Sequence, residues 1–180
     1  MSLLDIPSTA DDVVLRDGST LRLRPPVYAD RTELVAFFAR LSPESRYQRF
    51  HGARRVDAPV VEAFLDPNWT ERGALVGTLA DENGEERIVA LASYARLREP
   101  QRAEVAFAVA DELQRRGIGT RLLERLASRA AAAGIERFVA EVLTENRRML
   151  TVFEHVGFEV KRELAGGEIE VEFPIAATAS

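Results

Sequence analysis

Residues 114–120 have the composition and spacing of a loop that could hold an anion. They read Gln-Arg-Arg-Gly-Ile-Gly-Thr and separate an apolar, strand-like run from a leucine-rich run with helical spacing. The first turn of a helix has backbone N–H groups without internal partners, and glycines let a ligand approach that backbone closely. The segment therefore predicts a cradle suited to a diphosphate, with Arg121 and the two arginines of the loop adding positive charge. A simpler alternative is that Gly117 and Gly119 only let the helix pack tightly on a sheet.

Two other glycine motifs are excluded by the residues around this loop. No Lys-Ser or Lys-Thr pair follows the second glycine, so the loop is not that of a nucleoside-triphosphate-binding P-loop. The glycine spacing also differs from the three-glycine fingerprint of dinucleotide-binding domains.

The first half of the chain predicts a hairpin followed by helices. Residues 13–24 alternate around Asp17-Gly18, which is a hairpin pattern. Asp30 and Glu33 have the spacing of a capping box at the start of a helix that runs to Leu41. Ser42 and Pro43 then start a second helix, and residues 57–65 form a third short helical segment.

From Gly73 onward strands alternate with helices. Gly134 ends the long helix, and Gly166-Gly167 joins the last two strands. The expected elements are strands over 74–80, 87–97 and 102–110, a helix over 117–133, a strand over 137–143, a helix over 145–155 and two closing strands. This order predicts an α/β (α+β) fold with a mixed, largely antiparallel sheet of about seven strands flanked by helices. We expect one domain over 13–175, with tails at 1–12 and 176–180.

Composition narrows the classes of function. The chain has 180 residues, 46% of them hydrophobic, and a net charge of −5, which argues against nucleic-acid binding. It has no cysteine, which excludes thiolate metal sites and cysteine nucleophiles, and we expect no metal. No apolar run approaches the length of a membrane span, and the first residues do not form a signal peptide. We therefore expect a cytoplasmic protein.

The segment from Ala103 to Phe158 resembles the GNAT family of acetyl-CoA-dependent N-acetyltransferases. That family has the signature Gln/Arg-x-x-Gly-x-Gly/Ala at the start of a helix, and residues 114–119 match every defined position. Asn146 after the next strand and Val156-Gly157-Phe158 after the next helix fit as well. The resemblance implies that the loop holds the pyrophosphate of coenzyme A.

The resemblance also implies where the rest of the cofactor lies. The strand over 102–110 would carry a bulge and splay from the next strand, and the pantetheine arm would lie in that gap. Phe153 stands where many members have a tyrosine that protonates the leaving thiolate, so the general acid is unassigned. The residues implied to contact the cofactor are Ala106, Phe107, Ala108, Val109, Gln114, Arg115, Arg116, Gly117, Ile118, Gly119, Thr120, Asn146 and Phe153.

Glu104 is the best candidate for the general base that acetyl transfer to an amine requires. An alkyl ammonium has a pKa of about 10.4, so a base must remove a proton before or during attack. Strand alternation places Glu104 on one face with Ala106 and Ala108, where small side chains leave room for a substrate. Apolar surroundings would raise the pKa of this carboxyl group toward neutrality. His51 and His155 are weaker candidates for the base.

A second resemblance concerns the acceptor. Residues 41–50, Leu-Ser-Pro-Glu-Ser-Arg-Tyr-Gln-Arg-Phe, and residues 15–25 are similar to segments of bacterial protein-lysine acetyltransferases. The usual target in that group is a lysine of an acyl-CoA synthetase, and a GNAT domain is often joined there to a second module. Arg46, Arg49, Arg54 and Arg55 could line an opening that meets an acidic protein surface.

Two alternatives stay open. A GNAT enzyme acting on a small amine should place acidic residues near the thioester, and Glu99 and Asp111 are candidates for that role. A non-catalytic module that senses acyl-CoA would fit the absence of a tyrosine at position 153, but it would leave Glu104 unexplained. The sequence does not give the oligomeric state or the acyl-chain preference.

Overall fold

A single eight-stranded sheet forms the centre of the computed structural model, which describes residues 10–50, 58–155 and 161–175. The strand order is β1-β2-β3-β4-β5-β6-β8-β7, and β5–β6 is the parallel pair in an otherwise antiparallel sheet. This confirms the predicted mixed, largely antiparallel sheet of about seven strands. The strands are β1 (Asp11–Val14), β2 (Thr20–Arg24), β3 (Arg72–Ala80), β4 (Glu86–Arg96), β5 (Arg102–Val109), β6 (Arg137–Leu143), β7 (Lys161–Ala165) and β8 (Glu168–Pro174).

The N-terminal hairpin adds two strands to the sheet because β2 pairs with β3 through Arg22–Arg24. Its first strand begins at Asp11, so two residues assigned by prediction to the N-terminal tail belong to the sheet. The predicted tail at 176–180 lies outside the described residues.

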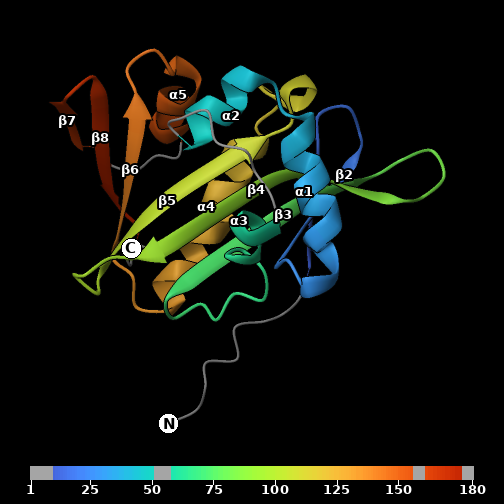
Figure 1. Ribbon diagram of the computed structural model, residues 1–180, viewed down its shortest axis with the longest axis horizontal. Coiled ribbons are helices and arrows are strands. Elements are labelled where there is room, and N and C mark those ends of the chain that lie inside the picture. The colour runs from blue at the N-terminus through green and yellow to red at the C-terminus, as the bar shows by residue number, and fades with distance from the viewer. Residues whose placement is uncertain (1–9, 51–57, 156–160, 176–180) are drawn as a thin grey trace, which may run out of the picture.

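Helices cover both faces of the sheet (Figure 1). On one face lie α1 (Arg31–Arg40), α2 (Pro43–Phe50) and α3 (Ala58–Glu62), after the short helix η1 (Tyr28–Asp30). The long helix α4 (Ile118–Ala132) covers the other face, next to α5 (Arg147–His155), and is preceded by the short helix η2 (Asp111–Leu113). None of the helices in the described ranges is long and apolar enough to cross a membrane.

Each face has its own apolar core. Leu34, Phe37 and Phe38 of α1 pack against Leu91 of β4 and Ala108 of β5 on the first face. On the second face, apolar side chains of α4 and α5 pack against those of β4, β5 and β6. The small residues of β5 that face α2 thus belong to a different layer from Phe107, which faces α4 and α5.

Strands β5 and β6 diverge after three paired positions. Arg102, Ala103 and Glu104 pair with residues 137–139, and no further pairing follows toward the ends of the strands. Figure 1 shows the two strands leaving a common end and opening into a V. The implied splay is therefore present. The implied bulge is not found in the β4–β5 pairing, whose register runs without a shift from Ala90–Val109 to Arg96–Ala103.

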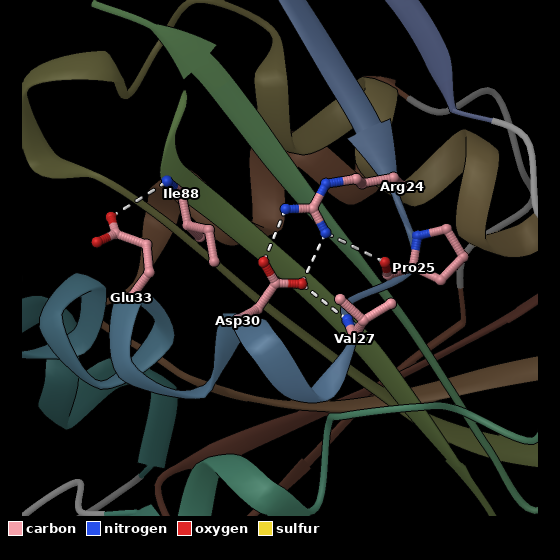
Figure 2. A network of polar contacts seen from close by, with 6 residues as sticks. All are labelled: Arg24, Pro25, Val27, Asp30, Glu33 and Ile88. Atoms are coloured by element: carbon pink, nitrogen blue, oxygen red, sulfur yellow. Dashed lines mark hydrogen bonds and ion pairs between the residues drawn. The ribbon is translucent and has the colours of Figure 1, made fainter. Parts of the chain in front are cut away.

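The predicted capping box at the start of α1 is wrong. The Asp30 carboxylate instead accepts hydrogen bonds from both terminal nitrogens of Arg24, at 2.7 and 2.8 Å, and from the Val27 N–H at 2.7 Å (Figure 2). Glu33 does not reach back; it accepts from the Ile88 N–H at 3.3 Å and pairs with Arg40 at 3.0 Å. Each carboxylate thus bonds to a residue of a strand, Arg24 of β2 or Ile88 of β4, in place of the predicted reciprocal partner.

Candidate functional site

A cavity of about 850 Å³ opens where the chain leaves β5 and enters α4. Its wall includes seven arginines and one glutamate, in a chain whose net charge is −5. Such a local excess of cations raises the concentration of anionic ligands at the opening. The charged residues are Arg16, Arg49, Arg115, Arg116, Arg121, Arg147, Arg148 and Glu124.

The glycine loop presents bare backbone to this cavity. Gly117 precedes the helix with φ of +81°, in the left-handed region that favours glycine, and Arg115 also has a positive φ of +66°. No side chain caps the first turn of α4 in the described structure, so its N–H groups are available to a ligand. Alternating backbone hand at a helix start is the geometry of an anion-binding concavity.

Gly119 has a packing role as well. A Cβ atom at this position would lie 3.2 Å from the Phe107 ring, so α4 starts in close contact with β5. Gly119 therefore has the close packing contact that the alternative expected of both glycines, whereas a Cβ atom at Gly117 would have nothing within 4 Å. The two roles are compatible because tight packing of the helix start fixes the direction of its N–H groups.

Side chains around the loop hold it in place. Gln114 donates from Nε2 to the Val109 carbonyl at 3.1 Å and to Ser45 Oγ at 3.4 Å, and its Oε1 accepts from Arg148. Arg116 forms an ion pair of 3.1 Å with Asp17 in the β1–β2 turn. The loop is therefore tied to β5, α2, α5 and the N-terminal hairpin.

Asn146 closes the cavity on the α5 side. It is 4% exposed, and its Oδ1 accepts from the Met149 N–H at 3.3 Å, which caps the first turn of α5. The side of α5 that faces the cavity carries Arg148, Thr151, Val152 and His155.

The structure brings together all but three of the residues predicted from the sequence. Those that line the cavity are Phe107, Ala108, Val109, Gln114, Arg115, Arg116, Gly117, Ile118, Gly119, Thr120 and Asn146. Ala106 lies on β5 beside them but is not part of the wall.

Phe153 occupies a different place from the one implied by the resemblance. It is 2% exposed and packs against Phe107 at 5.9 Å and Phe173 at 5.2 Å between ring centroids. Its side chain thus lies in the core behind the wall of the cavity, because α5 turns this position toward β5 and β8. Val156-Gly157-Phe158 lie outside the described residues.

Glu104 lies at the point where β5 and β6 separate, since it forms the last of their pairs. The unshifted register confirms the predicted alternation, because Glu104, Ala106 and Ala108 fall on the same face of β5. The expected apolar surroundings are not found: Glu104 is exposed. It stands outside the cavity wall, on the face of the sheet that α2 covers.

Arg49 is one of four arginines predicted to line an opening toward a protein surface, and its side chain does line the cavity. The sequence did not predict that it reaches the sheet, where it donates from Nη2 to Ser93 Oγ at 3.3 Å. Burial lowers the pKa of its guanidinium to about 10, against the opposing effect of the Glu104 charge. Only its neighbour Phe50 in the sequence gives a hint, since cation–π contact needs an aromatic close by.

Other missed residues and weaker candidates also have definite places. Val13, Val14, Leu15 and Arg16 line the cavity from the N-terminal hairpin, 100 residues before the glycine loop, and no local pattern could have shown this. His155 lines the cavity with its Nδ1 2.8 Å from the Thr151 carbonyl. His51, Arg54 and Arg55 lie outside the described residues.

Comparison with known proteins agrees with this geometry. The model of the acetyltransferase (GNAT) family matches residues 35–158. The chain belongs to the GNAT acetyltransferase family. The GNAT domain of PAT from S. lividans superposes with a TM-score of 0.82 at 37% identity, over 92% of this chain and 96% of that domain.

Two curated relatives extend the comparison. Acetyltransferase Pat of Mycolicibacterium smegmatis is 30% identical over 90% of this chain, which spans 48% of that protein. Acetyltransferase PA5475 of Pseudomonas aeruginosa is 30% identical over 83% of this chain and 80% of its own length. The chain therefore spans about half the length of the first relative and most of the second. Acetyltransferases of this family use acetyl-CoA.

Proposed function

We propose that this chain binds acetyl-CoA in the arginine-lined cavity and transfers the acetyl group to a lysine of another protein. The observation that carries the proposal is the uncapped first turn of α4 behind Gly117, in a cavity whose wall includes residues 107–109 of β5 beyond its last pair with β6. The residues present fit the group: the turn offers N–H donors to a diphosphate, and the divergent strands leave room for a pantetheine arm.

The bound thioester supplies an activated acyl group, and residues of the chain direct the acceptor to it. The amine nitrogen bonds to the carbonyl carbon while the carbon–sulfur bond breaks. We assign Glu104 to accept the proton of that nitrogen through a water, since it is exposed beside the gap and on the acceptor face. No acid is needed for the departing thiolate, because a thiol pKa of about 8.5 makes it a good leaving group.

A protein substrate is supported by the resemblance of residues 15–25 and 41–50 to protein-lysine acetyltransferases and by the likeness to the Pat proteins. In the structure residues 43–50 form α2, which covers the face that carries Glu104. The acceptor face is therefore built from the segment that carries the resemblance. We also propose that the chain acts as one domain in the cytoplasm.

A small-amine substrate has less support. Its site should bring Glu99 and Asp111 together near the thioester, but Glu99 pairs with Arg102 at 3.1 Å. Asp111 accepts from the Ser42 N–H and from the hydroxyls of Ser42 and Ser45, at 2.9, 2.8 and 2.6 Å. Both carboxylates are thus engaged at separate places, and neither is free to receive an ammonium group.

An assay of free-thiol release separates the proposal from its alternatives. Acetyl-CoA is supplied with a panel of small amines and, separately, with a purified acyl-CoA synthetase that carries a reactive lysine. We expect thiol release with the protein and none above background with the amines. Release with an amine alone selects the small-substrate enzyme. Binding of acetyl-CoA by calorimetry without release in any mixture selects the sensor, and absence of binding removes the proposal.

A further inference from the structure

The Arg49 side chain is partly buried, and its guanidinium forms no ion pair with a carboxylate within the described residues. Its Nη2 bonds to the neutral hydroxyl of Ser93, and its Nε has no hydrogen-bond partner within the described ranges. Glu104 acts on it through its charge, but the two make no ion pair in the part of the chain that the structure describes. An unpaired donor on a charged group that is shielded from solvent is costly, and a bound water, ion or ligand can supply the missing partner.

Three neighbouring side chains hold the guanidinium of Arg49 in position. The guanidinium carbon lies 4.9 Å from the ring centre of Phe50 and 5.5 Å from that of Phe64. The bond to Ser93 attaches it to β4, at the residue that pairs with Ala106 of β5. A planar group held between two rings and a hydroxyl has little freedom to turn, which favours recognition of a ligand in one orientation.

Arg49 and the glycine cradle belong to one cavity but to different sheet faces. The cradle lies at the start of α4, whereas Arg49 reaches the wall from α2 on the opposite face of the sheet. Its partner Ser93 is paired with Ala106 of β5, which is two residues after Glu104. A thioester whose diphosphate sits on the cradle and whose arm follows the β5–β6 gap brings its acyl end toward Arg49.

We infer that Arg49 forms an anion subsite at the acyl end of the cavity, which receives a negatively charged oxygen of the acyl group. The inference rests on the proposed coenzyme A site. Two sources could supply such an oxygen. With acetyl-CoA it is the carbonyl oxygen, which gains the electron pair of the C=O bond as the amine attacks and returns it when the carbon–sulfur bond breaks. With a dicarboxylic acyl chain it is the terminal carboxylate.

Two coenzyme A thioethers of nearly the same shape test the subsite without catalysis. S-carboxymethyl-CoA carries a carboxylate at the acyl position, and S-acetonyl-CoA carries a neutral ketone. Calorimetry on the wild-type chain should show the carboxylate bound about tenfold more tightly or better, as expected for a charge-assisted hydrogen bond in a buried site. In Arg49→Met this preference should vanish while the affinity for S-acetonyl-CoA stays the same.

Arg31→Met is the matched control. It removes the same charge from the same face, but Arg31 pairs with Glu62 at 2.9 Å and is absent from the cavity wall. It should keep the preference, which excludes a general effect of net charge. Arg49→Lys keeps the positive charge without the Nε–H and should show a reduced preference. It also gives a second variant if the methionine chain does not fold.

The outcomes distinguish this inference from the proposed function. Binding of both analogues without a preference in the wild type, or a full preference retained in either Arg49 variant, overturns the subsite alone. Failure of the wild type to bind either analogue overturns the subsite together with the coenzyme A site.

Turnover identifies the source of the oxygen once the preference is found. If it is the attacked carbonyl, Arg49→Met lowers kcat with acetyl-CoA while the KM for acetyl-CoA stays the same. If it is a resident carboxylate, the wild type has a higher kcat/KM for succinyl-CoA than for acetyl-CoA, and Arg49→Met reverses that order.

Discussion

One end of the proposed site is formed by backbone groups and the other by side chains. The phosphate end consists of backbone N–H groups at the start of α4, in a conformation set by Gly117. The proposed acyl end is formed by side chains from separate segments: Arg49 of α2 in the cavity wall, Ser93 of β4, to which Arg49 donates, and Glu104 of β5 outside the wall. A ligand at the first end would be held by backbone N–H groups, whereas chemistry at the second end would depend on individual functional groups.

This difference explains why the glycine loop can be recognised from the sequence and the cluster of side chains cannot. A backbone site requires glycines at fixed spacing, so it leaves a local pattern of six residues. A side-chain site assembled from residues 49, 93 and 104 leaves no local pattern, because only the pairing of β4 with β5 and the packing of α2 on them bring these residues together. Substitutions at the two ends should therefore act on different measured quantities.

The largest effect should come from the acyl end. Glu104→Gln removes the proposed base and should lower kcat by roughly 10²-fold, within the usual range for loss of general-base catalysis. The Kd of acetyl-CoA should not change, since Glu104 lies outside the cavity wall. Glu99→Gln is the control, because Glu99 precedes the same strand and is 69% exposed. Near-normal turnover of the Glu104 variant between pH 7 and 9 would exclude this residue as the base.

A substitution in the glycine loop should change the affinity for acetyl-CoA rather than kcat. Gly117→Val forces a branched side chain into a left-handed conformation at a cost of about 1–2 kcal/mol, and relaxation of the loop moves the N–H groups of the cradle. We expect the Kd of acetyl-CoA to rise roughly tenfold, measured by calorimetry, with kcat at saturation largely kept.

Gly84→Val is the matched control for this change. Gly84 has a similar φ of +79° and the same open surroundings, but it lies in the β3–β4 turn. It should lose as much stability as the Gly117 variant and no affinity. Equal losses of affinity in the two variants would show that the effect at Gly117 comes from general destabilisation.

A cluster around Asp111 connects the two ends. Asp111 follows β5 and accepts from Ser42 and Ser45 at the start of α2, while Gln114 of the cofactor loop donates to Ser45. Asp111→Asn should lower the stability of the fold at pH 7 by about 1 kcal/mol, the usual net contribution of one or two hydrogen bonds. It should also raise the KM for the acceptor severalfold, because α2 covers the acceptor face.

The stability that Asp111 contributes should be present at neutral pH and lost in acid. Burial would raise the pKa of Asp111, but the hydrogen bonds from Ser45 and Ser42 outweigh it and hold the pKa below its ordinary value of 3.8. The ionised carboxylate therefore contributes its stability above pH about 3.8, and that contribution is lost as the pH falls through the lower folded-state value. Melting temperatures of wild type and variant should differ at pH 7 and converge as the pH falls below 3.8 and through the lowered folded-state pKa of Asp111. Glu112→Gln, at the exposed next position, should show no such pattern.

The elements of the fold likewise divide into those that a local sequence pattern predicts and those that only tertiary packing determines. Elements fixed by local signals were predicted within a few residues, such as the helix between Gly117 and Gly134 and the cap at Ser42, whose Oγ accepts from the Ser45 N–H at 3.1 Å. The residues of the glycine loop line the cavity at the start of that helix, and their pattern is local as well. The inward direction of Phe153 has no local signal, because its packing partners Phe107 and Phe173 lie far away in the sequence.

The smallest effect on activity should come from the ion pair that replaced the predicted capping box. Arg24 and Asp30 are 23% and 12% exposed, far less than the surface pair of Arg22 and Asp12. Asp30→Asn leaves the Arg24 charge half-buried without a partner and frees the Val27 N–H, so the free energy of unfolding should fall by about 2 kcal/mol. Neither kcat nor the Kd of acetyl-CoA should change, because both residues lie outside the cavity wall.

Asp12→Asn tests the same loss of charge at the surface, where an ion pair contributes at most about 1 kcal/mol. Chemical denaturation of both variants should therefore show a clear loss for Asp30 and little for Asp12. Equal losses would mean that the burial of the Arg24–Asp30 pair does not increase its contribution to stability. A fall in turnover with Asp30→Asn would show instead that this end of α1 controls the acceptor face, and the separation between the two ends of the cavity would then be incomplete.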